Sequence, residues 1–467
     1  MTYRPSDLSN LRVAIVGAGP AGIYAGNILA RTVAEAGGTV AIDLFDALPA
    51  PYGLIRYGVA PDHPRIKGIV TSLHEMLDEG TARFLGNVEV GRDIALDELR
   101  RYYDAVIIAT GAIRDAALEI PGIDLPGSFG AADFVAWYDG HPDVPRDWPL
   151  DTAEVAVIGN GNVALDVARI LAKLPEDLRT TEVPDNVLAG LEASAVTDVH
   201  VFGRRGPADI KFTPIELREL GEVPGVDIVV YEEDFADADP ATASNNQLKV
   251  MLRVMDQWRR RETGGGARRL HLHFHHAPVE VLGTDRVTGV RFERTAPNGD
   301  GTFSGTGELR DIAVGQVYRA VGYYGTAVAG APFDPARGVV PNIEGRVIDA
   351  GGVGHSGANL AGLYATGWIK RGPVGLIGHT KSDAMETIAH LVQDVEAGVI
   401  PRAESDADIA GVLAVRGIPA TTWDGWLALD AHERHLGATH RHHRERVKVV
   451  PREEQVEISR AGALIGS

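Results

Sequence analysis

The stretch from Arg12 to Ala25 constrains the fold more than any other part of the chain. Its first residues predict a buried strand, and the motif G-A-G-P-A-G at Gly17–Gly22 predicts a tight turn that leads into a helix. In such a turn Gly17 permits the change of direction, Gly19 leaves bare backbone against a pyrophosphate, and Gly22 lets the helix pack closely on the strand. The helix N-terminus then presents free N–H groups to phosphates. The stretch therefore predicts a dinucleotide site.

An acidic residue at the end of the next strand supports this interpretation. The strand V-A-I-D-L-F is followed by Asp46, whose carboxylate can accept hydrogen bonds from both ribose hydroxyls. We prefer Asp46 to Asp43, which comes earlier in the alternation of the strand. The segment Leu48–Lys67 is too rich in proline and glycine to be a regular element. A long ordered loop beside a cofactor turn usually lines the site, so we expect this loop to do so.

Three further elements are predicted before the first part of the chain ends. Apolar spacing predicts a helix over Ile69–Glu79, and Val88–Val90 is expected to form a short strand. The apolar run Tyr103–Ala109 predicts a buried strand that ends in Thr110 and Gly111. A turn of this kind lets the backbone approach the bound dinucleotide a second time.

The opening pattern returns later in the chain as V-A-V-I-G-N-G-N-V-A-L-D. Gly159, Gly161 and Ala164 occupy the three small-residue places of the turn. Two such units in one chain indicate two cofactors that exchange electrons. The strand that follows the second copy ends in Arg204 and Arg205, and guanidinium groups suit a 2′-phosphate that a carboxylate would repel. We therefore predict NADP, rather than NAD, as the second nucleotide.

Composition excludes several classes of function. The chain has no cysteine, which removes disulfides, thiolate metal sites, iron–sulfur clusters and thiol catalysis. Its net charge of -19 argues against broad binding to nucleic acid or anionic membranes. No apolar run approaches the roughly 18 residues that span a bilayer, and the N-terminal residues form no apolar signal core. The length of 467 residues predicts two or three domains. We also expect a cytoplasmic location, no membrane insertion and, for the oligomeric state, a monomer.

One basic helix allows two interpretations. The segment Asn245–Arg261 is predicted to be helical and carries Lys249, Arg253 and Arg260 along adjoining turns. These cations could form a solvated helix face. In an otherwise acidic chain they could equally form a docking patch for an acidic protein, and the sequence leaves both open.

Histidines gather in two places, and we expect no metal at either. Strict alternation would put His271, His273 and His275 on one side of a strand, next to His276, at a spacing too regular to converge with a fourth ligand. The second cluster lies in a basic segment near the C-terminus and comprises His440, His442 and His443.

The end of the chain is predicted to return to the first unit. Leu363–Thr366 is predicted to be an apolar strand, and the glycines after it precede a helix over Lys381–Val395. A return of this kind would build one site from both ends of the chain. In the charged segment that follows, Trp423 and Trp426 are the expected anchors.

Five motifs together resemble the adrenodoxin reductase type of ferredoxin–NADP reductase, over nearly the full length of the chain. Two of them, the loop P-Y-G-L-I-R-Y-G-V-A-P-D-H-P and the segment G-W-I-K-R-G-P-V-G-L-I-G, are specific to this group. Flavoproteins with two dinucleotide sites share the others, which are G-A-G-P-A-G, G-N-G-N-V-A-L-D and G-R-R-G-P.

The resemblance implies an α/β fold with two Rossmann-like dinucleotide-binding domains, in which an NADP domain is inserted into an FAD domain. We expect the FAD domain to comprise residues 1–112 and 325–467 and the NADP domain to comprise residues 113–324. The implied reaction passes a hydride from nicotinamide C4 of NADPH to flavin N5 of FAD. Single electrons then pass to a ferredoxin-type iron–sulfur protein, which could dock near Lys249 and Arg253.

The resemblance also assigns roles to individual residues. It places His63 near the isoalloxazine ring, linked to Asp166, and it places Glu219 with Glu216 near the nicotinamide half of NADP. We take His63, Asp166 and Glu219 as the catalytic set. The predicted FAD-binding residues are Gly17, Gly19, Pro20, Ala21, Gly22, Asp46, Gly53, Leu54, Thr110, Gly111, Trp368, Gly375, Leu376 and Ile377. The predicted NADP-binding residues are Gly159, Asn160, Gly161, Asn162, Val163, Arg204, Arg205, Glu216 and Gly375.

Other functions compete with this one. A pyridine nucleotide–disulfide reductase has the same architecture but needs a pair of redox cysteines, which this chain lacks. An NADPH-dependent diaphorase or mono-oxygenase that acts on a small molecule remains open, as does an electron-input subunit like that of glutamate synthase. A non-catalytic protein that senses NADPH would bind nucleotide without reducing a flavin.

Overall fold

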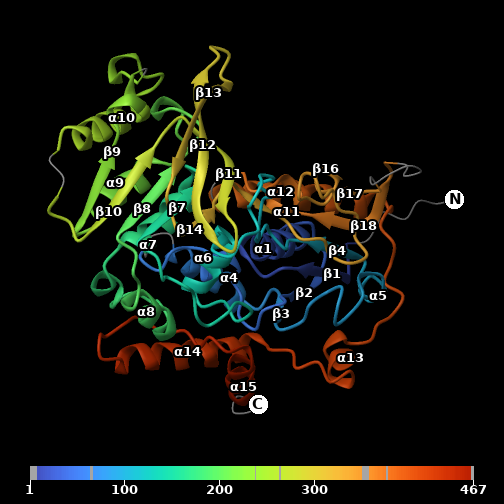
Figure 1. The fold of residues 1–467 in the computed structure, drawn as a ribbon. Coiled ribbons are helices and arrows are strands. Elements are labelled where there is room, and N and C mark those ends of the chain that lie inside the picture. Colours follow the sequence, from blue (N-terminus) through green and yellow to red (C-terminus); the bar gives the residue numbers. More distant parts are fainter. Residues whose placement is uncertain are drawn as a thin grey trace.

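The computed structural model describes residues 8–63, 67–236, 238–261, 264–349, 357–374 and 377–463. Two main β-sheets, each covered by helices, stand next to each other in this part of the chain (Figure 1). The first is parallel except for two antiparallel pairs at one edge, and the second is parallel throughout. A smaller antiparallel sheet lies against the second parallel sheet, and the C-terminal helices run along one side of the molecule (Figure 1).

The first sheet is built from both ends of the chain. Within the described residues its seven strands follow the order β16-β17-β18-β4-β1-β2-β3. The N-terminal strand β1 lies between β2 and β4, and β18 from the far end of the chain pairs in parallel with β4. The predicted return of the chain is therefore confirmed. Strand bounds are β1 Leu11–Val16, β2 Val40–Phe45, β3 Arg83–Leu85, β4 Ala105–Ile108, β16 Asn342–Ile343, β17 Arg346–Ile348 and β18 Asn359–Ala365.

One predicted strand of this sheet was wrong. The strand expected at Val88–Val90 is absent there, where Val90 forms only an isolated bridge to Ile94. The strand lies earlier, at β3, and it pairs in parallel with the end of β2. Phe84 of β3 is buried in the core. Tertiary pairing at the sheet edge decides this position, because a run of three residues is too short to show a period.

The second sheet lies entirely within the middle of the chain. Its described strands follow the order β6-β14-β7-β8-β10-β9 and pair in parallel throughout. Because its segments fall between β4 and β18 of the first sheet, the second unit is inserted into the first, as predicted. The bounds are β6 Ser128–Gly130, β7 Glu154–Ile158, β8 Asp198–Phe202, β9 Val226–Val230, β10 Arg268–His273 and β14 Gln316–Arg319.

Two smaller sheets complete the architecture. The antiparallel strands β11 His276–Gly283, β12 Val287–Pro297 and β13 Phe303–Ile312 share a core with one face of the second sheet, in which Phe202 packs with Phe292. A two-stranded antiparallel ribbon pairs β5 Arg114–Asp115 with β15 Tyr323–Tyr324. The chain thus leaves the first unit and returns to it at neighbouring points.

Helices cover the sheets on the faces that the apolar residues select. Leu29 and Val33 of α1 pack in one buried cluster with Ile388 and Leu391 of α12, so the first and last helices of the first unit lie together. The α-helix bounds are α1 Pro20–Glu35, α2 Leu54–Tyr57, α4 Val70–Asp78, α5 Leu96–Leu99, α6 Ala131–Tyr138, α7 Asn162–Ala172, α8 Asp185–Glu192, α9 Pro214–Gly221, α10 Asn246–Arg259, α11 Trp368–Arg371, α12 Ile377–Glu396, α13 Ile409–Val415, α14 Trp423–Thr439 and α15 Arg452–Ala463.

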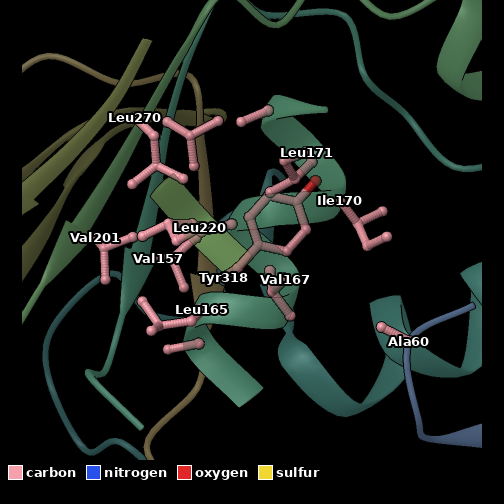
Figure 2. Close-up of a cluster of buried hydrophobic side chains, with 14 of the residues drawn as sticks. Ala60, Val157, Leu165, Val167, Ile170, Leu171, Val201, Leu220, Leu270 and Tyr318 are labelled. Carbon is pink, nitrogen blue, oxygen red and sulfur yellow. The ribbon is translucent and has the colours of Figure 1, made fainter. Parts of the chain in front are cut away.

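The core of the second unit includes a residue from the first. Its sheet contributes Val157, Leu270 and Tyr318, and α7 contributes Leu165 (Figure 2). Ala60, which comes from the loop after α2, belongs to the same fully buried cluster (Figure 2). The prediction that Leu48–Lys67 contains no regular element was wrong at α2, where four residues form one helical turn. The part of the segment just after α2 reaches from one unit into the other.

The C-terminal segment is anchored by tryptophan, as predicted. Trp426 is buried, and its ring meets Tyr52 edge-on at 5.6 Å between centroids. The Arg56 guanidinium lies 5.0 Å from the centre of the same ring. Trp423 is partly buried against the first core and donates a hydrogen bond to Asp78 at 3.2 Å.

Buried charges join this segment to both units. Glu433 is fully buried and accepts two hydrogen bonds from Arg56, at 2.9 and 2.5 Å. Lys448 donates to the backbone oxygens of Arg56 and Asp139, and it lies 3.1 Å from Glu182. Burial lowers the pKa of Lys448 to about 8. Each of these charges has a partner of opposite sign, which is the condition for keeping them out of water.

None of the helices in the described residues is both long enough and apolar enough to cross a membrane.

We predict that Glu433→Ala destabilises the chain by about 3–5 kcal/mol, because it leaves the buried Arg56 guanidinium without its partner. Arg434→Ala is the matched control, since the ion pair that it removes from Asp430 is half-exposed and such pairs contribute about 0–1 kcal/mol. Urea unfolding followed by tryptophan fluorescence measures both. Equal losses in the two variants would contradict a stabilising role for the buried pair.

Candidate functional site

The first glycine turn has the geometry that a bound dinucleotide requires. Gly17 has a φ of +114°, and a Cβ atom there would lie 2.4 Å from the Ala109 carbonyl oxygen at the end of β4. A Cβ on Gly22 would lie 1.9 Å from the Gly17 carbonyl oxygen, so the helix can pack here only without a side chain. The helix α1 begins at Pro20, and the N-cap residue Gly19 offers its amide groups no side-chain partner. These N–H groups are therefore available to phosphate.

The acidic residue predicted for the ribose lies directly at this turn. The two carboxylate oxygens of Asp46 accept hydrogen bonds from the backbone amides of Ala18, at 2.7 Å, and Leu48, at 2.8 Å. Burial raises the pKa of Asp46 to about 6, although both hydrogen bonds lower it. Asp43, the alternative, is instead held by Arg83 and by the Tyr103 hydroxyl, at 2.6 Å.

Three further segments with predicted FAD residues gather around the same turn. Tyr52 donates its backbone N–H to the Ala18 oxygen at 2.8 Å, and a Cβ on Gly53 would lie 3.2 Å from the Gly19 Cα. Leu54 is the first residue of α2, and Thr110 and Gly111 follow β4. From the far end of the chain, a Cβ on Gly367 would lie 2.6 Å from the Ala21 Cβ, and Trp368 begins α11.

The residues around this turn fit a bound dinucleotide. The Thr110 hydroxyl is buried and has no hydrogen-bond partner among the described residues, so it is available to a ligand. The glycines leave a bare cradle that a side chain would fill. Of the predicted residues, Gly375 and Leu376 lie outside the described part of the chain, and Ile377 is the first residue of α12.

The second glycine turn repeats the first. Gly159 has a φ of +137°, and a Cβ atom there would lie 2.1 Å from the Ala320 carbonyl oxygen at the end of β14. Gly161 is the N-cap residue of α7 and again offers no side-chain cap. A Cβ on Gly203 would lie 2.6 Å from the Asn160 side-chain nitrogen, which has no hydrogen-bond partner among the described residues.

The first residues of α7 are held from α9. Asn162 donates to a Glu216 carboxylate oxygen at 3.1 Å and accepts a hydrogen bond from the Thr213 amide at 3.1 Å. Val163, beside it, packs partly buried against the second core. Burial raises the pKa of Glu216, and its second carboxylate oxygen is buried without a described partner. Glu216 is therefore held at the second glycine turn, and its place near the nicotinamide half of NADP stays a prediction.

The two arginines that follow β8 are held by their backbone and not by their side chains. The Arg205 carbonyl accepts a hydrogen bond from the His275 amide at 3.1 Å, and the Arg204 carbonyl accepts one from the Thr295 hydroxyl at 2.7 Å. Among the described residues neither guanidinium group has an ion-pair partner. A fixed loop with unpaired guanidinium groups is suited to bind a phosphate.

His63 connects the two units. It belongs to the loop after α2, is 3 % exposed, and meets α7 and α9 of the second unit. Its Nε2 atom lies 2.9 Å from Asp166 Oδ1, and its Nδ1 atom lies 2.9 Å from Glu219 Oε2. The fold thus brings together the three residues that we took as the catalytic set.

The charges around His63 determine its protonation. Burial lowers the pKa of His63, and so does the Arg169 guanidinium, one nitrogen of which lies 2.7 Å from Nε2. The hydrogen bond and the charge of Asp166 raise it more, so the net shift is upward from 6.5. The imidazolium therefore persists at pH values above 6.5, and it is lost as the pH rises further.

The sequence analysis missed three residues of this junction. Arg169 is buried and donates two hydrogen bonds to Asp62, both at 2.9 Å, and it forms an ion pair with Asp166 at 2.8 Å. Lys173 donates to the same Asp62 at 2.9 Å. The spacing of Asp166, Arg169 and Lys173 places them on one helix face, and this signal could have identified them as a charged cluster inside a predicted core helix.

We predict that Asp166→Asn moves the titration of His63 to lower pH, because it removes the carboxylate that holds the proton. Nuclear magnetic resonance of histidine labelled with ¹³C, with the His63 signal assigned from His63→Gln, measures this pKa. Asp198→Asn is the control, because Asp198 hydrogen-bonds another buried histidine, His271, on the second sheet. A His63 titration that is the same in both variants would show that Asp166 does not set the protonation.

Comparison with known proteins gives a match to one family model. Residues 11–200 match the family model described as pyridine nucleotide-disulphide oxidoreductase. Since the chain contains no cysteine, it shares the dinucleotide fold of that family but not its disulfide chemistry.

Several curated proteins match almost the whole chain. The NADPH-ferredoxin reductase FprA of Mycobacterium tuberculosis is 38% identical over 96% of this chain and 98% of its own. The mitochondrial NADPH:adrenodoxin oxidoreductase of Homo sapiens is 37% identical over 90% of this chain and 87% of its own. Among solved structures, Mycobacterium tuberculosis FprA in complex with NADPH has a TM-score of 0.87 at 37% identity and covers 96% of this chain and 99% of its own. The chain therefore belongs to the family of NADPH-ferredoxin reductases and NADPH:adrenodoxin oxidoreductases.

Proposed function

We propose that this chain is a ferredoxin–NADP(+) reductase, which takes a hydride from NADPH with a bound FAD and passes the electrons to a ferredoxin-type iron–sulfur protein. One observation carries the proposal. His63, on the loop that follows α2 in the first unit, lies between Asp166 on the helix of the second turn and Glu219 on α9. Two dinucleotide sites with a shared protonated residue between them suit a transfer of hydride from one nucleotide to the other.

The domain division proposed from the sequence is consistent with the strand pairing. The FAD domain would comprise residues 1–112 and 325–467, and the NADP domain residues 113–324. The ribbon of β5 and β15 supports this division, because its strands lie just inside the two proposed boundaries.

The chain's own residues do little acid–base chemistry in this proposal, and their main work is to position the nucleotides. FAD, when bound, supplies the step from a two-electron donor to a one-electron acceptor. The bare backbone of Gly17, Gly19 and Gly22 would hold the FAD pyrophosphate, and Asp46 would accept hydrogen bonds from its ribose. The unpartnered Thr110 hydroxyl would be a further hydrogen-bonding group for FAD.

Residues of the second unit would hold NADPH. Gly159 and Gly161 form the turn for its pyrophosphate, and Arg204 and Arg205 would bind its 2′-phosphate. His63 would hold a positive charge beside the reacting rings while its proton is shared with Asp166. We propose that this charge changes how readily the bound FAD is reduced.

Replacing Arg204 and Arg205 by alanine should weaken NADPH binding by about 1.5–3 kcal/mol for each charge-assisted hydrogen bond that the arginines make to the 2′-phosphate. NADH binding should change little, because NADH has no 2′-phosphate. Isothermal titration with both nucleotides tests this, with Arg291→Ala on the neighbouring strand β12 as the control. An equal weakening of NADPH and NADH binding would reject a role in binding the 2′-phosphate.

The solvent-facing side of α10 is our proposed docking site for the iron–sulfur protein, because the opposite side, with Leu248 and Leu252, packs in the second core. Lys249 and Arg253 lie one turn apart on it, and neither has an ion-pair partner among the described residues. Arg260, the third cation named from the sequence, is instead paired with Asp256 at 2.9 Å. In a chain with a net charge of -19, an unpaired basic pair of this kind suits an acidic partner.

Reversing the charge with Lys249→Glu or Arg253→Glu should raise the apparent KM for an acidic ferredoxin and flatten its dependence on salt. Reduction of a small dye with NADPH should be unchanged. Arg337→Glu, at an exposed position of the first unit, makes the same change in net charge and is the control. If reduction of the dye and of ferredoxin fall together, the basic pair serves the structure and not the docking.

The experiment that tests the whole proposal is NADPH-driven reduction of cytochrome c, with and without a small ferredoxin, repeated with NADH. We expect a yellow protein whose activity depends strongly on ferredoxin and prefers NADPH. Reduction that is independent of ferredoxin would leave both nucleotide sites in place but move the acceptor to a small molecule or oxygen. In that case a diaphorase or mono-oxygenase would describe the chain better.

A further inference from the structure

Three histidines from two strands of the second sheet lie close together. His271 and His273 are on β10, and His200 is on the neighbouring parallel strand β8, where it pairs in register with His271. One ring nitrogen from each residue can be chosen so that all lie within 4.8 Å of one another. We predicted no metal here because His271, His273 and His275 alternate too regularly to converge. His200 belongs to no motif and was not among the residues considered.

The structure also changes the membership of the cluster. The strand β10 ends at His273, and the chain then turns at His275, whose φ is +58°. The backbone amide of His275 bonds to the loop of Arg205, so His275 is not part of a row of histidines along one strand. His276 begins β11 and bonds the Phe274 carbonyl. His200 takes the place that His275 had in the prediction.

The cluster lies on the face of the sheet that is turned away from α7. Residues next to the histidines in sequence, such as Val201 and Leu272, belong to the core beneath that helix. Because side chains alternate along a strand, the three imidazoles project to the other face. There His273 stacks on Phe202 at 4.4 Å between centroids, and all three histidines are 9 % exposed or less. Low exposure to solvent favours the neutral form of an imidazole.

Carboxylates hold two of the rings from outside the cluster. His200 lies with Nε2 at 2.7 Å from Glu154, and His271 lies with Nε2 at 2.9 Å from Asp198. Asp198 also forms an ion pair with Arg269, at 2.5 Å. Histidines that bind a metal commonly donate their other N–H group to a carboxylate, which fixes the tautomer and the ring. Glu154 and Asp198 stand where such second partners are found.

The Nδ1 atom of His200 faces the cluster. With Nε2–H directed to Glu154, Nδ1 carries the lone pair, and it lies 3.0 Å from His273 Nε2. An ion bound to both nitrogens would replace the hydrogen bond between them after a small displacement, and the Nε2 proton of His273 would move to its Nδ1 or leave to solvent.

Binding of an ion to all three histidines would require one of the rings to turn. The rings of His200 and His271 are stacked, with 4.2 Å between centroids and 13° between planes, so their lone pairs do not yet point at one site. Rotation of His271 about its Cβ–Cγ bond would turn a nitrogen toward the His200–His273 pair. This rotation would break the present hydrogen bond between the Tyr231 hydroxyl and His271 Nδ1, which is 2.8 Å long. The ion would have to compensate for that hydrogen bond.

The geometry points to a binding site for a divalent transition-metal ion, with His200, His271 and His273 as its ligands and Glu154 and Asp198 as their hydrogen-bond partners. Imidazole ligands suit zinc, copper and nickel, and three protein ligands with an open fourth position are a common zinc arrangement. The ion would connect β8 to β10 directly before the loop of Arg204 and Arg205. Its role would be to brace the sheet that carries this loop.

The test uses the full-length protein after treatment with a chelator and gel filtration. Isothermal titration with zinc chloride should show one ion bound per chain, and titration with cobalt chloride should give the visible absorption of a four-coordinate site. His200→Gln and His271→Gln should abolish the cobalt absorption. Glu154→Gln should keep it but weaken zinc binding by about 10–100-fold, as expected for loss of a second partner.

The matched control is His440→Gln combined with His442→Gln, a partly buried pair far along the chain whose ring centroids lie 5.4 Å apart. It should bind zinc like the unmodified chain. The proposal is overturned if the unmodified chain binds no zinc, or if zinc binding is the same in His200→Gln as in the unmodified chain, which would identify an adventitious ion only. If the histidine variants do not fold, crystals of the unmodified chain soaked in zinc decide the question, since the anomalous signal must lie among the three imidazoles.

Discussion

The ion pairs between Asp62 and the cations of α7 and its C-terminal end fix the relation between the two dinucleotide units. Asp62 receives two hydrogen bonds from Arg169 and one from Lys173, and these partners hold its pKa well below the usual range despite burial. A buried pair of this kind contributes modest net stability, but removing one partner is costly. Its structural effect is therefore one of position: the loop from the first unit can dock on α7 in one way, with His63 beside Asp166.

A second constraint acts at each glycine turn, where a carbonyl group lies too close for any side chain. The Ala109 carbonyl lies against Gly17, and the Ala320 carbonyl lies against Gly159. In both units the carbonyl comes from the strand next to the one that leads into the turn. The same close approach thus arises twice in one chain. The difference between the sites lies in the residue after the following strand, which is Asp46 in one unit and Arg204 in the other.

The distribution of charge separates binding surfaces from supporting structure. Buried cations such as Arg56 and Lys448 are neutralised, the first by Glu433 and the second by Glu182. The guanidinium groups of Arg204 and Arg205, and the basic pair Lys249 and Arg253 on α10, have no such partners among the described residues. In an acidic chain, unpaired cations on a fixed loop or an exposed helix mark places where an anion can bind without breaking an existing pair.

The sequence by itself determined the elements, because each depends on neighbouring residues: the strand, glycine turn and helix of both units, the acid after β2 and the arginines after β8. It could not place β3, whose three residues carry no period, and the prediction of a regular row of histidines was wrong at His275. Only the tertiary structure decided that Asp62 meets Arg169 across more than one hundred residues of chain, and that His200 stands beside His271. Both contacts arise where separate elements pack together, and no local pattern encodes which faces will meet, because that choice depends on the burial of the whole chain.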